Sequence, residues 1–161
     1  MIILEGPDGG GKSTLAARLH RDYDYAIVKT GPPALDEDTT AAYLSALYTA
    51  LARPGLTIFD RLHLGEAIYG PLLRSTDRMG ASGLKVIERA IAENGVRLII
   101  CVPPWEILMA GWRSKYDLLK NETQLRYVYE AYLGHAVRLD IIPHDWTAPD
   151  AEERIKEMIE A

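Results

Sequence analysis

Short runs of apolar residues alternate along the chain with longer stretches in which apolar residues return every three or four positions. The runs are typical of strands buried in a parallel sheet, and the longer spacing is typical of amphipathic helices. The runs predict strands at 2–4, 25–29, 56–60, 96–102 and 138–142. Helices are predicted from the end of a glycine-rich stretch to about residue 22, and at 36–52, 83–93, 105–110, 121–136 and 148–160.

Strands that alternate with helices predict βαβ units, in which helices cover both faces of a parallel sheet. The expected fold class is therefore α/β, a three-layer arrangement around a five-stranded parallel sheet. A chain of 161 residues is long enough to bury one substantial core, so residues 1–161 are expected to form a single domain.

The stretch between the first strand and the first helix carries the clearest chemical signal. It reads Gly6-Pro-Asp-Gly-Gly-Gly11-Lys12-Ser13 and fits the phosphate-loop pattern G-x-x-x-x-G-K-[ST]. Glycines let consecutive N–H groups point at one polyphosphate, Lys12 can reach the β and γ phosphates, and the Ser13 hydroxyl can bind Mg²⁺. The sequence thus predicts a P-loop NTPase-type domain whose nucleotide-binding residues are Gly6, Asp8, Gly9, Gly10, Gly11, Lys12, Ser13 and Thr14.

Charged residues follow the predicted strand at 56–60. Asp60 ends that strand, where a P-loop fold places its second magnesium-associated carboxylate; the alternative is an aspartate that only caps the next turn. Arg61, Arg74 and Arg78 come next in the chain. Guanidinium groups suit bidentate phosphate contacts, although exposed arginines are also common in surface ion pairs.

Composition narrows the range of partners and compartments. Hydrophobic residues make up 48% and charged residues 25% of the chain, as in an ordinary globular protein. A net charge of −5 disfavours a large nucleic-acid interface, which is usually basic. The single cysteine, Cys101, lies in an apolar run and favours a packed thiol in a reducing cytoplasm. No apolar stretch reaches the length of a membrane span, and no signal peptide is recognised.

Several functions of P-loop domains are disfavoured by what the rest of the sequence contains. The base-reading motif N-K-x-D of switch GTPases does not occur, and large ATPases usually need a longer chain. Arginines after the predicted metal strand and a basic stretch between the last helices suit phosphoryl transfer to a small acceptor. Cations are needed there because two anionic substrates must meet in line.

Residues 5–14, EGPDGGGKST, resemble the P-loop of thymidylate kinases, and Asp60 with Arg61 is similar to that family's aspartate–arginine motif. Residues 60–70 are similar to those of small thymidylate-kinase-like proteins of phages and some bacteria. Residues 112–115 and the helix predicted after them resemble the family's lid and the helix that follows it. The resemblance implies an ATP- and Mg²⁺-dependent kinase of a deoxynucleoside monophosphate. Thymidylate or a related pyrimidine, including a modified one, is the expected acceptor.

The resemblance also implies residue roles. Asp8 is expected to face the acceptor sugar and Arg61 to hold the acceptor phosphate, with Arg74 and Arg78 as further acceptor contacts. Because the loop position that carries an arginine in some family members is Gly10 here, the lid, at about residues 111–120, is expected to supply the catalytic cation from Arg113 or, second, Lys115. The aromatic residue that stacks on the acceptor base is left open among Tyr69, Tyr116 and a tryptophan.

The resemblance further implies a homodimer, located in the host cytoplasm if the chain is encoded by a phage. Two alternatives to the nucleotide kinase stay open. One is a P-loop kinase of another acceptor, such as a nucleoside or a hydroxymethyl pyrimidine within DNA, and the other is an ATP-binding regulatory module without turnover.

Overall fold

The computed structural model describes residues 1–112 and 118–160. The chain forms two compact units, one made of Met1–Glu5 and Lys12–Ile99, the other of Gly6–Gly11 and Ile100–Ala161. We call them the first and the second unit. The chain therefore crosses between the units at both ends of the glycine-rich loop and again within the last strand.

The sheet has the strand order β2-β3-β1-β4, in which β1 is Ile2–Glu5, β2 is Ala26–Lys29, β3 is Thr57–Asp60 and β4 is Arg97–Ile100. β3 runs parallel to both β1 and β2, and Asp60 is level with Leu4 on one side and with Lys29 on the other. Every residue of β1 and β3 is buried, as expected for continuous apolar runs at the centre of a parallel sheet.

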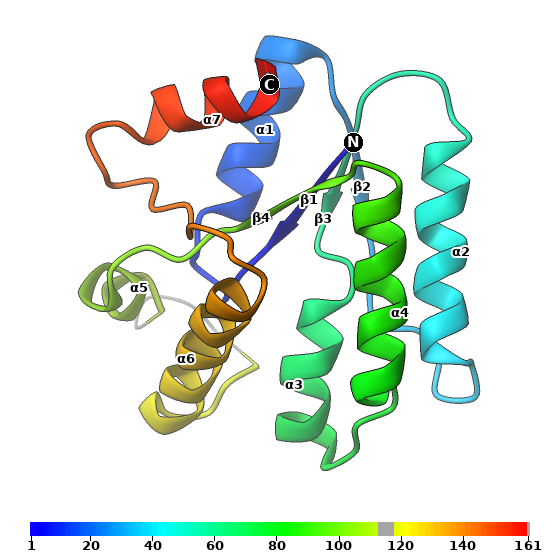
Figure 1. Cartoon of the computed structure of the whole chain (residues 1–161). Helices are drawn as coiled ribbons and strands as arrows, with labels where there is room; N and C mark the ends of the chain where they lie inside the picture. The colour runs from blue at the N-terminus through cyan, green and yellow to red at the C-terminus, as the bar shows by residue number, and fades with distance from the viewer. Residues whose placement is uncertain (113–117, 161) are drawn as a thin grey trace. The chain divides into compact units, whose positions relative to one another are not determined.

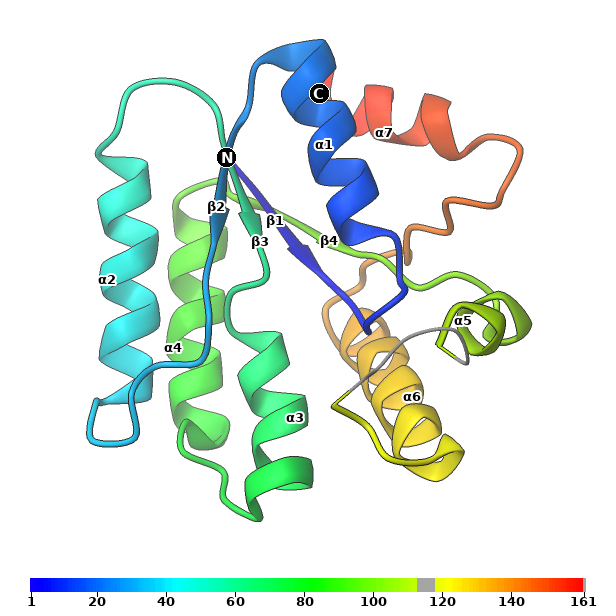
Figure 2. The same ribbon diagram turned by 180° about the vertical axis from the view of Figure 1, so that it is seen from behind.

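Four helices belong to the first unit: α1 (Lys12–Tyr23), α2 (Thr39–Leu51), α3 (Leu64–Arg74) and α4 (Gly80–Glu93). Both ribbon views place α2 and α4 side by side, with α3 next to α4 (Figures 1 and 2). The Asp38 side chain caps α2 by accepting a hydrogen bond from the Ala41 N–H, so acids before this helix do favour its N-terminus.

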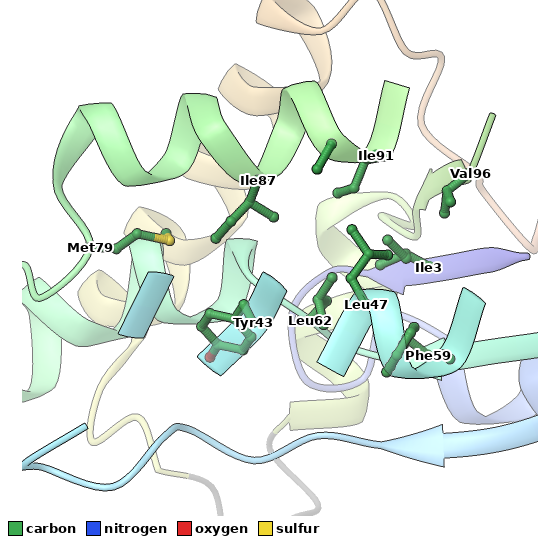
Figure 3. Packing of buried hydrophobic residues seen from close by; sticks show 11 residues of the cluster. Ile3, Tyr43, Leu47, Phe59, Leu62, Met79, Ile87, Ile91 and Val96 are labelled. Carbon is green, nitrogen blue, oxygen red and sulfur yellow. The ribbon is translucent and has the colours of Figure 1, made fainter. Parts of the chain in front are cut away.

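The core of the first unit lies between the sheet and this helix pair (Figure 3). α2 contributes Tyr43 and Leu47, α4 contributes Ile87, and the strands contribute Ile3 and Phe59, all of them buried. Burying such side chains removes most of their apolar surface from water, which is the main force that holds an α/β unit together.

The second unit contains α5 (Trp105–Trp112), α6 (Glu122–Arg138) and α7 (Ala151–Glu160). Trp105 of α5 meets Tyr129 of α6 edge to face, with ring centroids 5.3 Å apart. The Asn121 side chain accepts a hydrogen bond from the Gln124 N–H and so fixes the start of α6. In the described part of the chain no helix is both long and apolar enough to cross a membrane.

The predicted fifth strand at 138–142 is wrong, because the sheet of the described residues has four strands. α6 continues to Arg138, its apolar positions having kept helical spacing up to Ala136, and Asp140 then adopts a left-handed conformation with φ 54°. The Ile141 N–H donates to the Ala136 carbonyl and closes the helix end. Beyond this range, His144 forms an isolated parallel bridge with Cys101.

Candidate functional site

The glycine-rich loop Gly6–Gly11 has the backbone that its sequence predicts. Gly6, Gly9 and Gly11 adopt φ values of 144°, 82° and 90°, which residues with side chains rarely adopt. The Gly10 N–H donates to the Pro7 carbonyl across 3.0 Å. Backbone in such turn conformations is typical of loops whose successive N–H groups bind phosphate oxygens.

Close packing is a second reason for glycine in this loop, at Gly6 and at Gly10. A Cβ atom on Gly6 would overlap the backbone carbonyl of Cys101, and one on Gly10 would lie 2.6 Å from the same oxygen. Cys101 itself is buried, as predicted from its apolar neighbours. Its contribution to the loop is therefore its carbonyl group, with the thiol packed in the core.

Trp146 lies against the last glycine of the loop. A Cβ atom on Gly11 would be 2.5 Å from Cδ1 of the Trp146 indole, although that side chain is 49% exposed. Trp146 lies within a tight turn in which the Asp145 carboxylate accepts hydrogen bonds from the N–H and the hydroxyl of Thr147. An exposed indole therefore borders the predicted phosphate loop.

Lys12 and Ser13 open α1 in the first unit. The Ser13 hydroxyl donates to Oδ2 of Asp60 across 3.1 Å, so the two predicted magnesium ligands are in contact. Lys12 is 4% exposed. Within residues 1–112 and 118–160 no three His, Cys, Asp or Glu side chains gather closely enough to hold a metal by themselves. A hydroxyl beside one carboxylate fits Mg²⁺, which commonly uses one or two carboxylates together with substrate phosphates and water.

Arg61 follows Asp60 in a strained conformation with φ 75°. Its N–H donates to the Leu4 carbonyl across 2.9 Å, and its carbonyl accepts from the Thr30 hydroxyl across 2.7 Å. Its guanidinium carbon lies 5.9 Å from the ring centroid of Tyr69, within the usual range for a cation–π contact. The structure thus brings together Arg61 and Tyr69, two residues predicted to bind the acceptor.

Arg74 and Arg78, the other predicted acceptor contacts, both pair with the buried carboxylate of Glu66. Oε1 of Glu66 lies 2.5 Å from Nη2 of Arg74 and 3.2 Å from Nε of Arg78. Arg78 also donates to the carbonyls of Pro33 and Ala34, which ties the loop before α2 to this pair of arginines. We call Glu66, Arg74 and Arg78 the Glu66 cluster.

Tyr43 and Glu5 are two titratable groups of the first unit whose pKa values are shifted by burial and by nearby charges. Burial raises the pKa of the Tyr43 hydroxyl, and the negative charges of Glu66 and Glu5 raise it further. Burial also raises the pKa of Glu5, while hydrogen bonds from the backbone and the charges of Arg61 and Lys12 lower it in part.

The remaining predicted residues lie in different parts of the chain. Asp8 is half-buried in the loop, and Thr14 is exposed in the first turn of α1. Arg113 and Lys115, the predicted lid cations, and Tyr116 lie outside the described residues.

Sequence reasoning assigned no role to Glu5 or Glu66, although both are acids beside or within apolar stretches. A carboxylate in a buried position costs free energy unless it is paired. An acid embedded among apolar residues is therefore the signal in the sequence that could have marked both positions.

No model of a protein family matches the sequence, and no curated protein sequence matches it either. Similarity is found among solved structures. The Bacillus subtilis YorR protein, in complex with phosphorylated GDP, has a TM-score of 0.75 and 21% identity, and the match covers 99% of this chain and 93% of that chain.

Deoxyadenosine kinase from M. mycoides with bound dATP has a TM-score of 0.64 and 15% identity, over 99% of this chain and 98% of the other. A gluconokinase from Sinorhizobium meliloti has a TM-score of 0.56 and 16% identity, over 94% and 85% of the two chains. At these identities the likeness establishes the fold. The chain has an α/β fold with a parallel sheet that is similar to those of P-loop kinases.

Proposed function

We propose that this protein is an ATP- and Mg²⁺-dependent kinase of a deoxynucleoside monophosphate, with thymidylate or a related pyrimidine nucleotide, modified ones included, as acceptor. The observation that carries the proposal is the 3.1 Å hydrogen bond from Ser13 to Asp60 directly after the G-x-x-x-x-G-K-[ST] loop. It joins a predicted phosphate site and a predicted metal site through two adjacent oxygen ligands.

The donor side of the reaction uses the loop and the start of α1. The loop N–H groups hold the β phosphate, and the Lys12 ammonium neutralises charge on the β and γ phosphates. Ser13 and Asp60 would hold Mg²⁺, directly or through water, and bound Mg²⁺ would offset the charge that develops on the phosphate oxygens. Lys12 is almost fully buried, which strengthens its interaction with phosphate relative to an exposed lysine.

The acceptor side uses the segment that follows β3. Arg61 grips the acceptor phosphate, and Asp8 faces the acceptor sugar. An oxygen of the acceptor phosphate attacks the γ phosphorus, a new P–O bond forms, and the bond to the β phosphate breaks to release ADP. Arg113, with Lys115 as second choice, would supply a cation to the transferring group.

A nucleoside acceptor is the second candidate function. Similarity in fold to deoxyadenosine kinase favours it. The Glu66 cluster also favours it, because Arg74 and Arg78 already pair with a carboxylate, whereas a monophosphate acceptor needs cations that bind its phosphate. The homodimer and the cytoplasmic location stay predictions.

The test is transfer of labelled phosphate from ATP with Mg²⁺ to a panel of acceptors. The panel contains common and modified deoxynucleoside monophosphates, free deoxynucleosides, and an oligonucleotide with hydroxymethyluracil. Fast transfer to one pyrimidine monophosphate supports the proposal. Transfer only to a nucleoside, or only to the oligonucleotide, would mean that this molecule is the acceptor and that the proposed acceptor is wrong.

Loss of activity is expected for Lys12→Ala, which should lower kcat by at least about 100-fold because it removes a preorganised cation from the transferring phosphate. A control on the surface of α4, Arg89→Ala, should leave the rate unchanged. Binding of ATP without transfer to any acceptor would favour the regulatory module instead.

A further inference from the structure

Glu5 is a fully buried carboxylate at the carboxyl end of β1, immediately before the glycine-rich loop. Its Oε1 accepts hydrogen bonds from the N–H groups of Leu62, across 2.9 Å, and Leu64, across 3.0 Å. In the part of the chain that the structure describes, its other oxygen, Oε2, is buried and has no hydrogen-bond partner. Such a group costs stability, so packing alone does not account for an acid at this position.

The two hydrogen bonds that Glu5 accepts fix the start of α3. Leu64 is the first residue of this helix, where N–H groups have no partner within the helix. His63, at the capping position, makes no side-chain hydrogen bond to the helix, and its Nδ1 lies 3.9 Å from Oε1 of Glu5. Glu5 therefore supplies from β1 the hydrogen-bond acceptor that a local N-cap residue usually provides.

The same bonds complete the restraint on Arg61. Its strained φ of 75° persists only if neighbouring groups hold the backbone. The Leu4 carbonyl holds its N–H, the Thr30 hydroxyl holds its carbonyl, and Glu5 holds the N–H of the next residue, Leu62. Residues of β1 and the residue that follows β2 thus determine the direction in which the Arg61 side chain leaves the backbone.

We propose that Glu5 is a positioning residue that holds residues 61–64 so that Arg61 is aimed at the acceptor. The proposal rests on the proposed function for its substrate, but its structural part can be tested without activity. Glu5 acts through the backbone of Leu62 and Leu64 and is not assigned a contact with either substrate.

The kinetic test compares Glu5→Ala and Glu5→Gln with a control of lowered stability, Ile91→Ala, a buried residue of α4. Glu5→Ala should raise KM for the acceptor by about 10-fold or more, the effect of losing about 1.4 kcal/mol of binding, while KM for ATP changes much less. Glu5→Gln keeps an oxygen acceptor and should rescue most of the effect. Equal changes in both KM values, no larger than in Ile91→Ala, would overturn the proposal.

The second readout is hydrogen exchange of the Leu62 and Leu64 amides, followed by NMR in the absence of substrates. These two amides should exchange faster in Glu5→Ala than in Ile91→Ala once global stability is taken into account. Unchanged exchange would overturn the proposal even if the enzyme is active. If the wild type phosphorylates no acceptor, the proposed function fails, and the exchange result alone decides whether Glu5 holds this segment.

Thr30→Val keeps the test decisive where Glu5→Ala does not fold. This variant removes the other side-chain hydrogen bond to the restrained segment, at the Arg61 carbonyl. It should raise KM for the acceptor, by less than Glu5→Ala does in a folded protein, and leave KM for ATP near that of the wild type. A Thr30→Val enzyme that folds and has an unchanged acceptor KM would overturn the proposal.

Discussion

Two stretches of this chain carry the predicted chemistry, and they are held in place in different ways. The loop at 6–11 depends on the conformations of its own glycines and on contacts of its backbone. The segment at 60–78 depends on charged and polar side chains, and two of them, Thr30 and Glu5, hold it from positions 31 to 59 residues away along the chain. A site built from local conformation can be recognised in a sequence, whereas one built from distant partners cannot.

The difference also predicts how each stretch responds to substitution. In the loop, added volume is harmful, because backbone atoms of Cys101 occupy the space that a side chain would need. In the segment after β3, loss of the buried Glu66 carboxylate is harmful, because it leaves Arg78, which is mostly buried, without this charged partner. Substitutions that add volume to the loop, and others that remove charge after β3, therefore test the comparison directly.

The largest effect is expected for Glu66→Ala. Removing this carboxylate leaves Arg74 and Arg78 without their common partner, and Arg78 has only 12% of its side chain exposed. The free energy of unfolding should fall by about 3 kcal/mol, as for other broken buried ion pairs. Glu66→Gln should cost less, since an amide oxygen can still accept a hydrogen bond. Urea denaturation measures both.

The matched control is Glu93→Ala, which breaks an exposed pair with Arg89 on α4. It should cause no measurable change in stability, because solvent screens exposed pairs. A Glu66→Ala variant as stable as Glu93→Ala would mean that the Glu66 cluster does not support the segment.

The next effect is expected for Gly10→Ala, which adds one methyl group to the loop. Its Cβ would lie 2.6 Å from the Cys101 carbonyl oxygen and 2.9 Å from that of Pro7, so the loop must shift. Overpacking of this kind usually costs about 2 kcal/mol. Binding of ATP, measured by calorimetry, should weaken at the same time because the N–H groups move.

Gly134→Ala is the corresponding control, since a Cβ there meets nothing within 4 Å and the residue lies inside α6. This change should raise the free energy of unfolding by about 0.5–1 kcal/mol through helix propensity. Gly10→Ala with unchanged stability and unchanged ATP binding would show that the loop is not held as tightly as its geometry indicates.

A smaller effect is expected for the pH dependence of stability in Glu5→Gln. Burial raises the pKa of Glu5 above its ordinary value of 4.5, against the opposing charges of Arg61 and Lys12. The folded wild type therefore binds a proton more tightly than the unfolded chain does. The stability of the wild type relative to Glu5→Gln should fall as pH rises from 4.5 through the raised pKa, by about 1.4 kcal/mol for each unit of the shift.

Denaturation of both proteins between pH 4 and pH 8 measures this difference. His63, which lies near Glu5, is present in both proteins, so its own titration largely cancels. A difference that stays constant, or that grows in favour of the wild type with rising pH, would contradict a raised pKa for Glu5.

The sequence predicts all four strands of the sheet, because each is a continuous apolar run bounded by breakers. It also predicts six of the helices, with the start of α2 indicated by Asp36, Glu37 and Asp38 and the end of α4 indicated by Asn94 and Gly95. The contact between Ser13 and Asp60 agrees with the same reasoning, since Asp60 ends β3 and the loop that leads to Ser13 begins after β1, the neighbour of β3 in the sheet.

The misses have physical causes. α3 has no local cap, contains Pro71, and begins where Glu5 from β1 accepts its first N–H, so nothing near it in the sequence predicts its start. The false strand at 138–142 is a short apolar pair after a helix that ends two residues later than expected. A run of apolar residues predicts a strand at 138–142 just as it does at the four observed strands. Whether a strand forms depends on the parts of the chain that surround the run.

The smallest effect on stability is expected for substitution of Trp146, whose fluorescence can also report what the loop binds. Because this indole is about half exposed, Trp146→Phe should change the free energy of unfolding by less than about 0.5 kcal/mol. Its contact with Gly11 nevertheless makes its fluorescence sensitive to what the loop binds. Addition of ATP with Mg²⁺ should change the emission of the wild type and leave that of Trp146→Phe nearly unchanged. An equal change in both proteins would mean that Trp105 or Trp112 gives the response. It would contradict the prediction that the nucleotide binds beside Trp146 at the loop.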